Sequence, residues 1–516
     1  MFVRKKRNKS GTVSVQIIDK TAGYKVIETI GSSKDDEQIA NLVRKAERQV
    51  WTSKGKQKEL FKKVTAVDLE EYIRGIVNTQ VQTIGPELIL GSLFDKIGFN
   101  VIKDDLFRHL VITRLVYPVS KLKTVDYLYR YQGVVIEIAT IYRFLDKLHS
   151  TYKATVEKIV FNHTKDVLKN ITVVFYDMTT LYFESEDEDD LRKVGFSKDG
   201  KFRNPQIMLG LLVGQEGYPI GYDIFEGNVF EGKTLLPTLA KIREKFGFGN
   251  PVVVADAAML SKQNMKQLQD NGYQFIIGGR IKNESAATKQ EIIEKAQTIK
   301  AQEIMPFKRQ DGSRLIVSYS SSRHKKDRYN RERGLRKLRQ GIQSGKLKKK
   351  HINNRGYNKF LKLTGTVEVE IDETKVEADS FWDGLKGYVT NTELPGDQVI
   401  ENYRHLWQIE KAFRISKTDL RIRPIHHYRQ RRIEAHICIA FVAYAVYKEL
   451  ERILNQNKSE ISPKRALELT QNMYAIECQM PDEIEKKKLI LKMDPEQQVL
   501  YDIVLKHCGI KFRVSQ

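Results

Sequence analysis

The segment ITVVFYD at residues 171–177 is an apolar run that ends on an aspartate. Its length and its β-branched and aromatic residues predict a buried strand. Four further apolar strands are predicted downstream, and helices at about 234–246 and from about 261 connect the later ones. These strands are QIMLGLLV (206–213), YPIGYDIF (218–225), PVVVAD (251–256) and QFIIGG (274–279).

The order of these elements is strand, strand, strand, helix, strand, helix, strand. The first three strands are close enough along the chain to form an antiparallel meander. The later strands need helical crossovers, which makes them parallel and right-handed. The predicted fold class is therefore α/β, with a mixed sheet that resembles the ribonuclease-H-like arrangement.

Two of the predicted strands end in an aspartate, Asp177 and Asp256. If these strands lie side by side and parallel, both carboxylates emerge at the edge of the sheet where ligands of open α/β proteins bind. Two converging carboxylates are costly unless a cation lies between them. Because carboxylates are hard oxygen ligands, the expected cation is Mg²⁺ or Mn²⁺.

A third carboxylate, Glu410, lies in the predicted helix YRHLWQIEKAFRISK (403–417). Tyr403, Glu410 and Lys417 are seven residues apart and form one stripe of such a helix, bordered by Arg414. A carboxylate flanked by an aromatic ring and cations suits a metal ligand beside a nucleic-acid backbone. Taken alone, an ordinary salt bridge on a solvated helix is the simpler interpretation.

Net charge indicates the kind of partner. The 516 residues include 88 Lys and Arg against 65 Asp and Glu, a formal net charge of +23. Residues 323–362 alone hold 16 basic and 2 acidic residues. A polyanion is the natural partner of this segment, because each neutralised phosphate releases counterions. The predicted DNA contacts within it are Arg323, Lys325, Lys326, Arg336 and Lys337.

Two other interpretations of the basic segment stay open. In the first interpretation, the basic segment is a solvated helix face or a flexible basic tail. A membrane surface is the less favoured partner, because the segment lacks an apolar face of Trp, Phe and Leu.

The composition excludes several classes of protein. With 41% apolar residues, the chain can bury real cores and is not disordered. Its longest apolar stretch, 437–447, is about half of the roughly 20 residues that a membrane-spanning helix needs. The N-terminus carries no recognisable secretory signal. Cys438, Cys478 and Cys508 form no ligand-spaced pair, which argues against a zinc module and fits a reducing cytoplasm, so a cytoplasmic protein is expected.

Six regions are predicted along the chain. Within the second, the helical patterns at 120–133 and 136–148 suit a DNA-binding helix-turn-helix, although any short helical hairpin looks similar. The fifth contains a long helix from about residue 396 and an apolar packing helix at 431–447. The regions are an N-terminal β-hairpin and helix (1–55), a helical region (56–170), the first part of the core (171–280), a basic inserted domain (281–395), the second part of the core (396–455) and a C-terminal helical region (456–516).

Three histidines in the fifth region are not expected to have a catalytic role. His426 and His427 follow a proline and are expected at the surface, where metal ligation is the weaker alternative. His436 is expected to be a core histidine with satisfied hydrogen bonds.

Three segments resemble the DDE transposases of bacterial insertion sequences, specifically the insertion-sequence family four group. They are FYDMTTLYFESEDEDDLRKVGFSKDGK (175–201), VVVADAAMLSKQNMKQL (252–268) and YRHLWQIEKAFRISK (403–417). The group's signature on the last segment is Tyr, two residues, Arg, three residues, Glu, six residues, Lys. Tyr403, Glu410 and Lys417 match it, whereas Leu406 occupies the arginine position. Arg404, Lys411 and Arg414 are the candidate substitutes for that arginine.

By that resemblance, Asp177, Asp256 and Glu410 are a metal-binding catalytic triad that holds two Mg²⁺ or Mn²⁺ ions. The implied chemistry is phosphodiester cleavage followed by strand transfer, for which no protein nucleophile is needed. The implied partners are double-stranded DNA, at the terminal inverted repeats and the target, and a second copy of the chain in a synaptic homodimer. No membrane partner is expected.

The resemblance also implies DNA contacts around the triad. Tyr403 and Lys417 are expected near the cut phosphate, with Arg404 and Arg414 close by. Trp382 is a candidate for stacking on a flipped base, which aromatic residues of this region do in hairpin-forming relatives. A packing tryptophan in FWDGL (381–385) is an equally good interpretation.

Two alternative functions remain at this point. One is a metal-dependent nuclease of the same fold that cleaves without strand transfer. The other is a DNA-binding repressor derived from a transposase, with a silent catalytic core.

Overall fold

The computed structural model describes residues 1–21, 23–53, 76–77, 80–197, 200–247, 249–257, 261–298, 303–364, 368–478 and 487–509. These residues fall into two compact units. The smaller unit draws on Met1–Ile84, Tyr129–Val134 and Asn472–Asp494, and the larger on Gly85–Leu128, Val135–Gln471 and Pro495–Gln516. The predicted boundaries at residues 171, 281 and 396 all fall inside the larger unit.

The smaller unit contains two three-stranded antiparallel sheets, of order β1-β2-β3 and β16-β15-β4. In the first, Val15 and Ile17 of β2 pack against Ile39 of α1. The sequence predicts neither β1 nor the second sheet, whose strands lie in regions predicted as helical. The elements are β1 (Phe2–Arg7), β2 (Val13–Asp19), β3 (Lys25–Ser33), α1 (Asp36–Ser53), β4 (Val81–Thr83), β15 (Tyr474–Cys478) and β16 (Lys487–Ile490).

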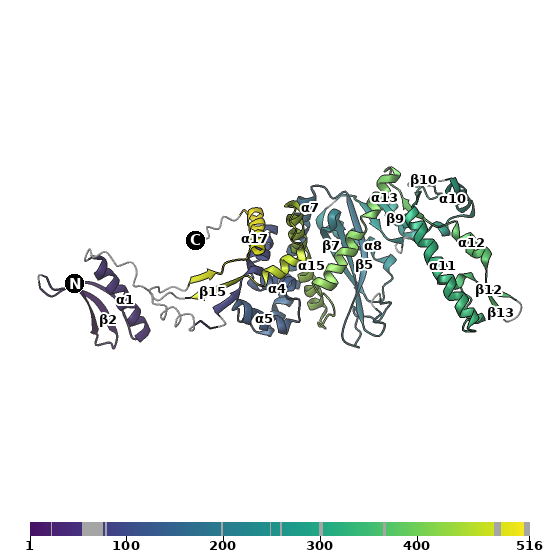
Figure 1. Ribbon diagram of the computed structural model, residues 1–516. Coiled ribbons are helices and arrows are strands. Elements are labelled where there is room, and N and C mark those ends of the chain that lie inside the picture. Colours follow the sequence, from purple (N-terminus) through teal and green to yellow (C-terminus); the bar gives the residue numbers. More distant parts are fainter. Residues whose placement is uncertain are drawn as a thin grey trace. The chain divides into compact units, whose positions relative to one another are not determined.

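An eight-stranded mixed sheet forms the centre of the larger unit, and Figure 1 labels several of its strands. Its order is β10-β11-β14-β9-β8-β5-β6-β7. The meander β5-β6-β7 is antiparallel and β5, β8 and β9 are parallel, as predicted. The strands are β5 (Val173–Tyr182), β6 (Gln206–Gly214), β7 (Pro219–Glu226), β8 (Val252–Ala255), β9 (Gln274–Gly279), β10 (Ile304–Lys308), β11 (Arg314–Tyr319) and β14 (Leu385–Thr390).

Three of these strands, β10, β11 and β14, come from the region 281–395 that the sequence predicts as an insertion. They extend the core sheet instead, because β14 pairs with β9 and β11 pairs with β14, both antiparallel. Apolar spacing along the chain cannot reveal a pairing such as Gly279 with Gly387. Only the segment between β11 and β14 leaves the sheet. It comprises α11 (Ser321–Gln343), β12 (Leu361–Thr364), β13 (Glu368–Ile371) and α12 (Glu373–Ser380). The sequence also predicts a strand at 366–371, whose start lies outside the described residues.

Alternate residues of the central strands face opposite sides of the sheet. One side is apolar: Tyr176 of β5, Ala255 of β8 and Phe275 of β9 belong to one buried cluster with α8, α9 and α10. The other side carries Asp177 and Asp256 and contacts α13 and α14. These helices are α8 (Leu235–Phe246), α9 (Lys262–Asp270), α10 (Ala286–Thr298), α13 (Gly396–Arg404) and α14 (Trp407–Arg414).

The sequence predicts one long helix from about residue 396, and this prediction is wrong. The helix ends at Arg404 and restarts at Trp407, and a π-helical turn, η11 (Ile415–Asp419), follows α14. Leu406 is buried at the break, and no glycine or proline marks it in the sequence. Tyr403, Glu410 and Lys417 are therefore not carried by one regular helix.

Most of the remaining helices contact α15, whose apolar run is buried along its length. α15 contacts α4, α6, α7 and β7. No helix among the described residues has the length and apolar character to cross a membrane. The helices are α3 (Ser92–Ile97), α4 (Asp105–Val116), α5 (Lys121–Gln132), α6 (Ile138–Lys147), α7 (Lys153–Leu168), α15 (Gln430–Gln456), α16 (Pro463–Thr470) and α17 (Pro495–Cys508).

The helices α5 and α6 occupy the two segments predicted as a helix-turn-helix. α6 is held against α15, where Arg432 donates two hydrogen bonds of 2.9 Å to the Asp146 carboxylate. A DNA-binding role for this pair stays a prediction.

Candidate active site

Neighbouring strands bring the two predicted aspartates side by side. The parallel ladder of β5 and β8 ends at the pair Tyr176 and Ala255, and Asp177 and Asp256 are the next residues. Because neighbouring strands lie about 4.8 Å apart, the two carboxylates emerge next to one another on the α13 and α14 side. Continued through β9 and β14, the same row reads Asp177, Asp256, Gly278 and Tyr388.

Glu410 lies on α14, the helix that packs against β5 and β6. Its side chain is exposed, as is that of Asp256, whereas Asp177 is half-buried. The negative charges of Glu410 and Asp256 both act to raise the pKa of Lys386 and the pKa of Tyr403. The third predicted carboxylate therefore faces the same region of the sheet as the second.

Each aspartate carboxylate accepts a hydrogen bond from the backbone N–H of the next residue in the chain. The backbone N–H of Met178 donates to Asp177 at 2.7 Å, and that of Ala257 donates to Asp256 at 2.7 Å. Among the described residues, no three His, Cys, Asp or Glu side chains are grouped closely enough to hold a metal ion. The donor set fits a hard divalent cation, since it consists of carboxylate oxygens. The three carboxyl groups must move closer to one another before they can share one.

Tyr403 is a buried side chain that connects α13 to the row. Its hydroxyl donates to Asp256 at 3.4 Å, and its ring lies edge-on to Tyr388 at 5.0 Å. Burial raises the pKa of Tyr403, and the charge of Asp256 acts in the same direction, so the phenol remains a donor. Gly278 makes room for it, because a Cβ at that position would lie 2.6 Å from the hydroxyl oxygen.

Lys386 is a residue of this site that the sequence analysis does not identify. Its Nζ lies 4.5 Å from the ring centre of Tyr403 and 5.3 Å from that of Tyr388. Burial lowers the pKa of Lys386, the cations Arg323 and Arg404 lower it further, and Asp256 opposes them. The clue in the sequence is a lysine inside the apolar strand LKGYVT (385–390).

A groove of about 940 Å³ adjoins these residues, lined by the start of α11, β14 and α13. Lys386, Arg323 and Arg404 contribute three cations to its lining. Arg404 is 72% exposed and pairs with Glu401 at 3.4 Å, and Arg323 pairs with Asp327 at 3.6 Å. The groove therefore offers positive charge directly beside the carboxylate row.

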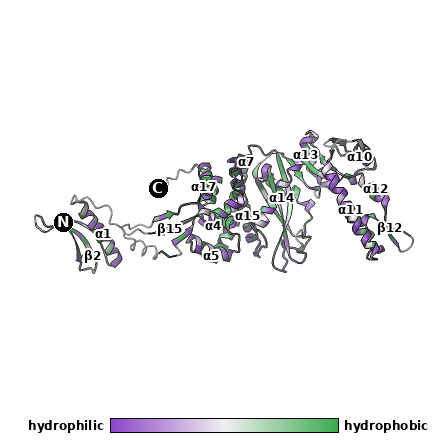
Figure 2. Ribbon diagram, in the orientation of Figure 1, coloured by the Kyte–Doolittle hydropathy of each residue, from purple (hydrophilic) through white to green (hydrophobic). Residues whose placement is uncertain are grey.

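Helix α11 presents a second basic surface. Its buried side is formed by Leu335 and Leu338, and Figure 2 shows the helix as predominantly hydrophilic. At about 100° per residue, five exposed cations gather on the side opposite those leucines. Within the described part of the chain these five make no ion pair, and we call them the α11 cation stripe. They are Lys325, Lys326, Arg333, Arg336 and Lys337.

Three predicted DNA contacts differ in their surroundings. Arg414 is exposed at the end of α14, whereas Lys417 is half-buried in η11. Trp382 is partly buried and packs against the apolar core, with Lys282 Nζ 6.0 Å from its ring. This position favours the packing interpretation of Trp382, while Phe381 beside it is 44% exposed.

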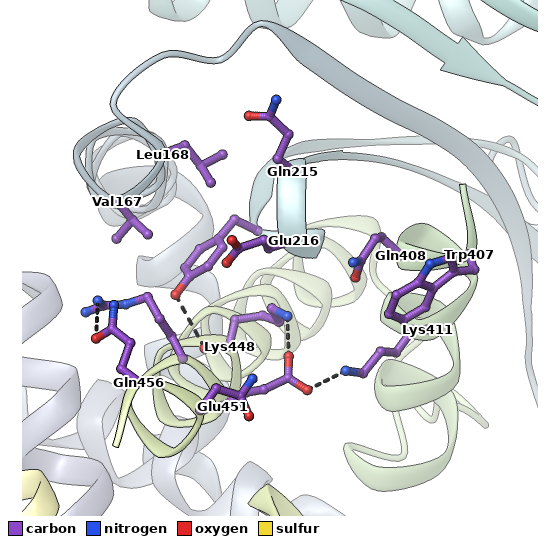
Figure 3. Close-up of a pocket in the computed structure, with 13 residues that line it drawn as sticks. Val167, Leu168, Gln215, Glu216, Trp407, Gln408, Lys411, Lys448, Glu451 and Gln456 are labelled. Atoms are coloured by element: carbon purple, nitrogen blue, oxygen red, sulfur yellow. Dashed lines mark hydrogen bonds and ion pairs between the residues drawn. The ribbon is translucent and has the colours of Figure 1, made fainter. Parts of the chain in front are cut away.

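The helix that carries Glu410 is anchored on another side by a charged network. Lys411 of α14 and Lys448 of α15 both form ion pairs with Glu451, as Figure 3 shows. The positive charges of these lysines lower the pKa of Glu451, although burial opposes them. The network borders a cavity of about 670 Å³, whose lining also includes Trp407, Gln408 and Glu216.

Residues 169–446 match the family model described as the transposase DDE domain. The chain belongs to this family. It is 31% identical over 122 residues to the transposase for insertion sequence element IS231F of Bacillus thuringiensis subsp. israelensis, a match that covers 22% of this chain and 26% of that protein. It is 30% identical over 101 residues to the IS231B transposase of Bacillus thuringiensis subsp. berliner, covering 18% and 21%.

These matches span about a quarter or less of the length of the curated relatives. Family membership confirms the resemblance to bacterial insertion-sequence DDE transposases, and the family-four assignment stays a prediction. Two solved transposase structures resemble the chain more weakly, with low sequence identity and low TM-scores. The piggyBac transposase synaptic complex with hairpin DNA has a TM-score of 0.38 at 9% identity, covering 75% of this chain and 76% of that one. The Mos1 transposase paired-end complex has a TM-score of 0.16 at 12% identity, covering 48% and 69%.

Proposed function

We propose that the chain is a DDE transposase that cleaves DNA at the terminal inverted repeats of an insertion sequence and joins the cut ends to target DNA. The observation that carries this proposal is the pair Asp177 and Asp256 on adjacent parallel strands, with the helix of Glu410 packed on the same side of the sheet. The strand order supports a ribonuclease-H-like core for the chemistry.

In this proposal Asp177, Asp256 and Glu410 hold the divalent ions, with Mg²⁺ or Mn²⁺ as the expected metal. When bound, two such ions activate a water or a DNA 3′-hydroxyl as nucleophile and stabilise the leaving oxygen. Tyr403 orients the Asp256 carboxylate through its hydroxyl. The ion pair of Lys411 with Glu451 anchors α14, the helix that carries Glu410.

DNA is bound by the basic groove and by the α11 cation stripe. Lys386 and Arg404 are proposed to contact the phosphates next to the cut, in the role that the signature arginine has in relatives. Leu406, which replaces that arginine, is buried and takes no part in this contact. The α11 cation stripe is proposed to contact phosphates without reading sequence. A second copy of the chain brings the other end of the element, because strand transfer joins two ends to one target.

The α11 cation stripe can be tested by neutralisation. Replacing Lys326, Arg333 and Lys337 by Gln is expected to weaken binding to every DNA sequence and to lower the salt dependence of log K by about 2–3, since each lost phosphate contact removes roughly one counterion. Equilibrium binding at several salt concentrations measures both. The matched control replaces Arg328 and Arg339, which pair with Glu332 and Glu373. If both sets of substitutions weakened DNA binding equally, the assignment of the α11 cation stripe as a DNA-contacting surface would be contradicted.

The function itself is tested by incubating the purified protein with Mg²⁺ or Mn²⁺, DNA that carries the element's ends and a target plasmid. Joined products are expected, and they disappear in Asp256→Asn. Nicked DNA without joining would replace the proposal by a nuclease. A mobility shift without cleavage would replace it by a repressor.

A further inference from the structure

A second basic site lies away from the carboxylate row, in a cavity of about 210 Å³. The cavity is formed by Arg114 of α4, the segment that leads into α5, the chain between η11 and α15, and His436 of α15. Its volume is well above the roughly 30 Å³ that one water molecule occupies in the liquid. The first turn of α5 adds the positive end of a helix dipole, and the Lys123 N–H within it donates to Ser120 Oγ at 3.4 Å.

Two cations of this cavity, Arg114 and Lys121, are buried without an acidic partner among the described residues. Arg114 and Lys121 are each only 6% exposed, and the segment after η11 adds Arg421 and Arg423 to the lining. Within the described part of the chain, no Asp or Glu lines the cavity, and Lys121 has no hydrogen-bond or ion-pair partner. Arg114 reaches only the carbonyl oxygens of Leu420 and Arg421, each at 3.5 Å. Buried charge of this kind is costly unless something pairs with it.

Two buried histidines complete the cavity, and they too lack acidic partners. The Nε2 of His436 lies 2.9 Å from the carbonyl oxygen of Ile422, but its Nδ1 has no partner among the described residues. Burial lowers the pKa of His427 to about 3, and Lys121 and Arg114 act in the same direction. Burial also lowers the pKa of Lys121, and Arg114 lowers it further. His427 was expected at the surface, and its burial corrects that prediction.

Elsewhere in the same unit, partly buried basic side chains have a carboxylate as partner. Glu449, almost fully buried, is paired with His507 at 2.9 Å, with Arg452 at 2.5 Å and with His163 at 3.3 Å. No such carboxylate serves Arg114 and Lys121 among the described residues. The cavity therefore suits an anionic ligand that pairs with Arg114 and Lys121.

We propose that this cavity binds a phosphate group, held by Arg114, Lys121 and the first turn of α5. The site goes beyond the proposed cleavage chemistry, and the assignment of its ligand to DNA rests on the proposed function. The phosphate belongs either to the DNA backbone or to a free small molecule, and both sources share the recognition chemistry described here.

Inorganic phosphate is the first probe. Phosphate is expected to raise the melting temperature of the full chain in a concentration-dependent way, beyond sodium chloride of equal ionic strength. In Lys121→Met this response is lost, while the melting temperature without phosphate stays equal or rises because an unpaired buried charge is gone. The matched control is Lys123→Met, an exposed lysine two residues along the same helix, which keeps the response. Line broadening of the phosphate ³¹P resonance by wild-type protein reports binding even if a variant fails to fold.

A methylphosphonate scan of end-bearing DNA separates the two sources. If a single neutral linkage weakens wild-type binding but not binding by Lys121→Met, the ligand is a backbone phosphate. If phosphate binds but no linkage couples to Lys121, the ligand is a free phosphate compound. The proposal is overturned if wild-type protein neither responds to phosphate nor broadens its resonance, or if Lys121→Met responds as the wild type does.

Discussion

Both sides of the central sheet are largely buried, but they differ in that one of them carries two carboxylates. Tyr176, Ala255 and Phe275 point into an apolar cluster covered by α8, α9 and α10. Their immediate neighbours on the other side include Asp177 and Asp256, which meet Tyr403 and the helix of Glu410. Because successive residues of a strand point to opposite sides of the sheet, a residue that stabilises the fold stands next to one that carries a carboxylate. We call these the apolar side and the carboxylate side.

The largest expected effect comes from the carboxylate side. Asp177→Asn, Asp256→Asn or Glu410→Gln is expected to reduce DNA cleavage at least about 1,000-fold, equivalent to about 4 kcal/mol of transition-state stabilisation. DNA binding and melting temperature should stay close to wild type, because none of the three side chains is fully buried. Cleavage assays, binding assays and thermal unfolding measure these three properties. Asp270→Asn at the end of α9 is the control, and a triad variant with full cleavage would remove that residue from the site.

The apolar side should respond in the opposite way. Phe275 is fully buried, so Phe275→Ala is expected to lower the free energy of unfolding by about 3–5 kcal/mol through lost burial and the cavity left behind. Chemical denaturation measures this loss. Cleavage per folded molecule should remain close to wild type. A variant that unfolds normally but fails to cleave would show that the two sides are not separable.

Gly278 tests how closely the carboxylate side is packed. Gly278→Ala is expected to push the Tyr403 hydroxyl away from Asp256 and to reduce cleavage roughly 10–100-fold, about 1.4–2.8 kcal/mol. In a Tyr403→Phe background the closest of the contacts of the new methyl group is gone, so the same change should cost less. The resulting coupling energy is expected to be about 0.5–3 kcal/mol. Strictly additive effects would mean that Tyr403 and Gly278 do not share this contact.

The smallest effect is expected at Lys386. Lys386→Met should reduce cleavage about tenfold and weaken DNA binding, because a single charge-assisted phosphate contact contributes about 1.5–3 kcal/mol at most. Lys362→Met is the control, since Lys362 is exposed and pairs with Glu370 at 3.1 Å. Cleavage and affinity measured at two salt concentrations separate the contact from general charge. Identical behaviour of the two variants would leave Lys386 without a role at the site.

Local patterns in the sequence predict much of this arrangement. The strands at 171 and 251 and their closing aspartates follow from apolar runs, and their parallel pairing follows from the intervening helix. The pairing of β14 with β9 joins residues 279 and 387, and no local pattern encodes a contact at that separation. For this reason the sequence predicts an insertion where three strands extend the sheet, and it does not identify Lys386.

The candidate site is predicted by residue type but not by geometry. The break before Trp407 carries no glycine or proline, so helical spacing implies one straight stripe where the structure has two helices and a π-helical turn. His427 lies against the rings of Tyr142 of α6 and His436 of α15, and the sequence around His427 does not predict these contacts. The helix break and the burial of His427 both depend on tertiary contacts, which the spacing of residues along the chain does not reveal.

Affinity cleavage tests the central claim most directly, namely that Asp177, Asp256 and Glu410 serve one metal site. Fe²⁺ replaces Mg²⁺ in the full chain with end-bearing DNA, and ascorbate with peroxide then generates radicals at the bound ion. We expect backbone cuts near residues 177, 256 and 410 together, all lost in Asp256→Asn. Cuts near only one of the three, or cuts that persist in Asp256→Asn, would contradict a shared site.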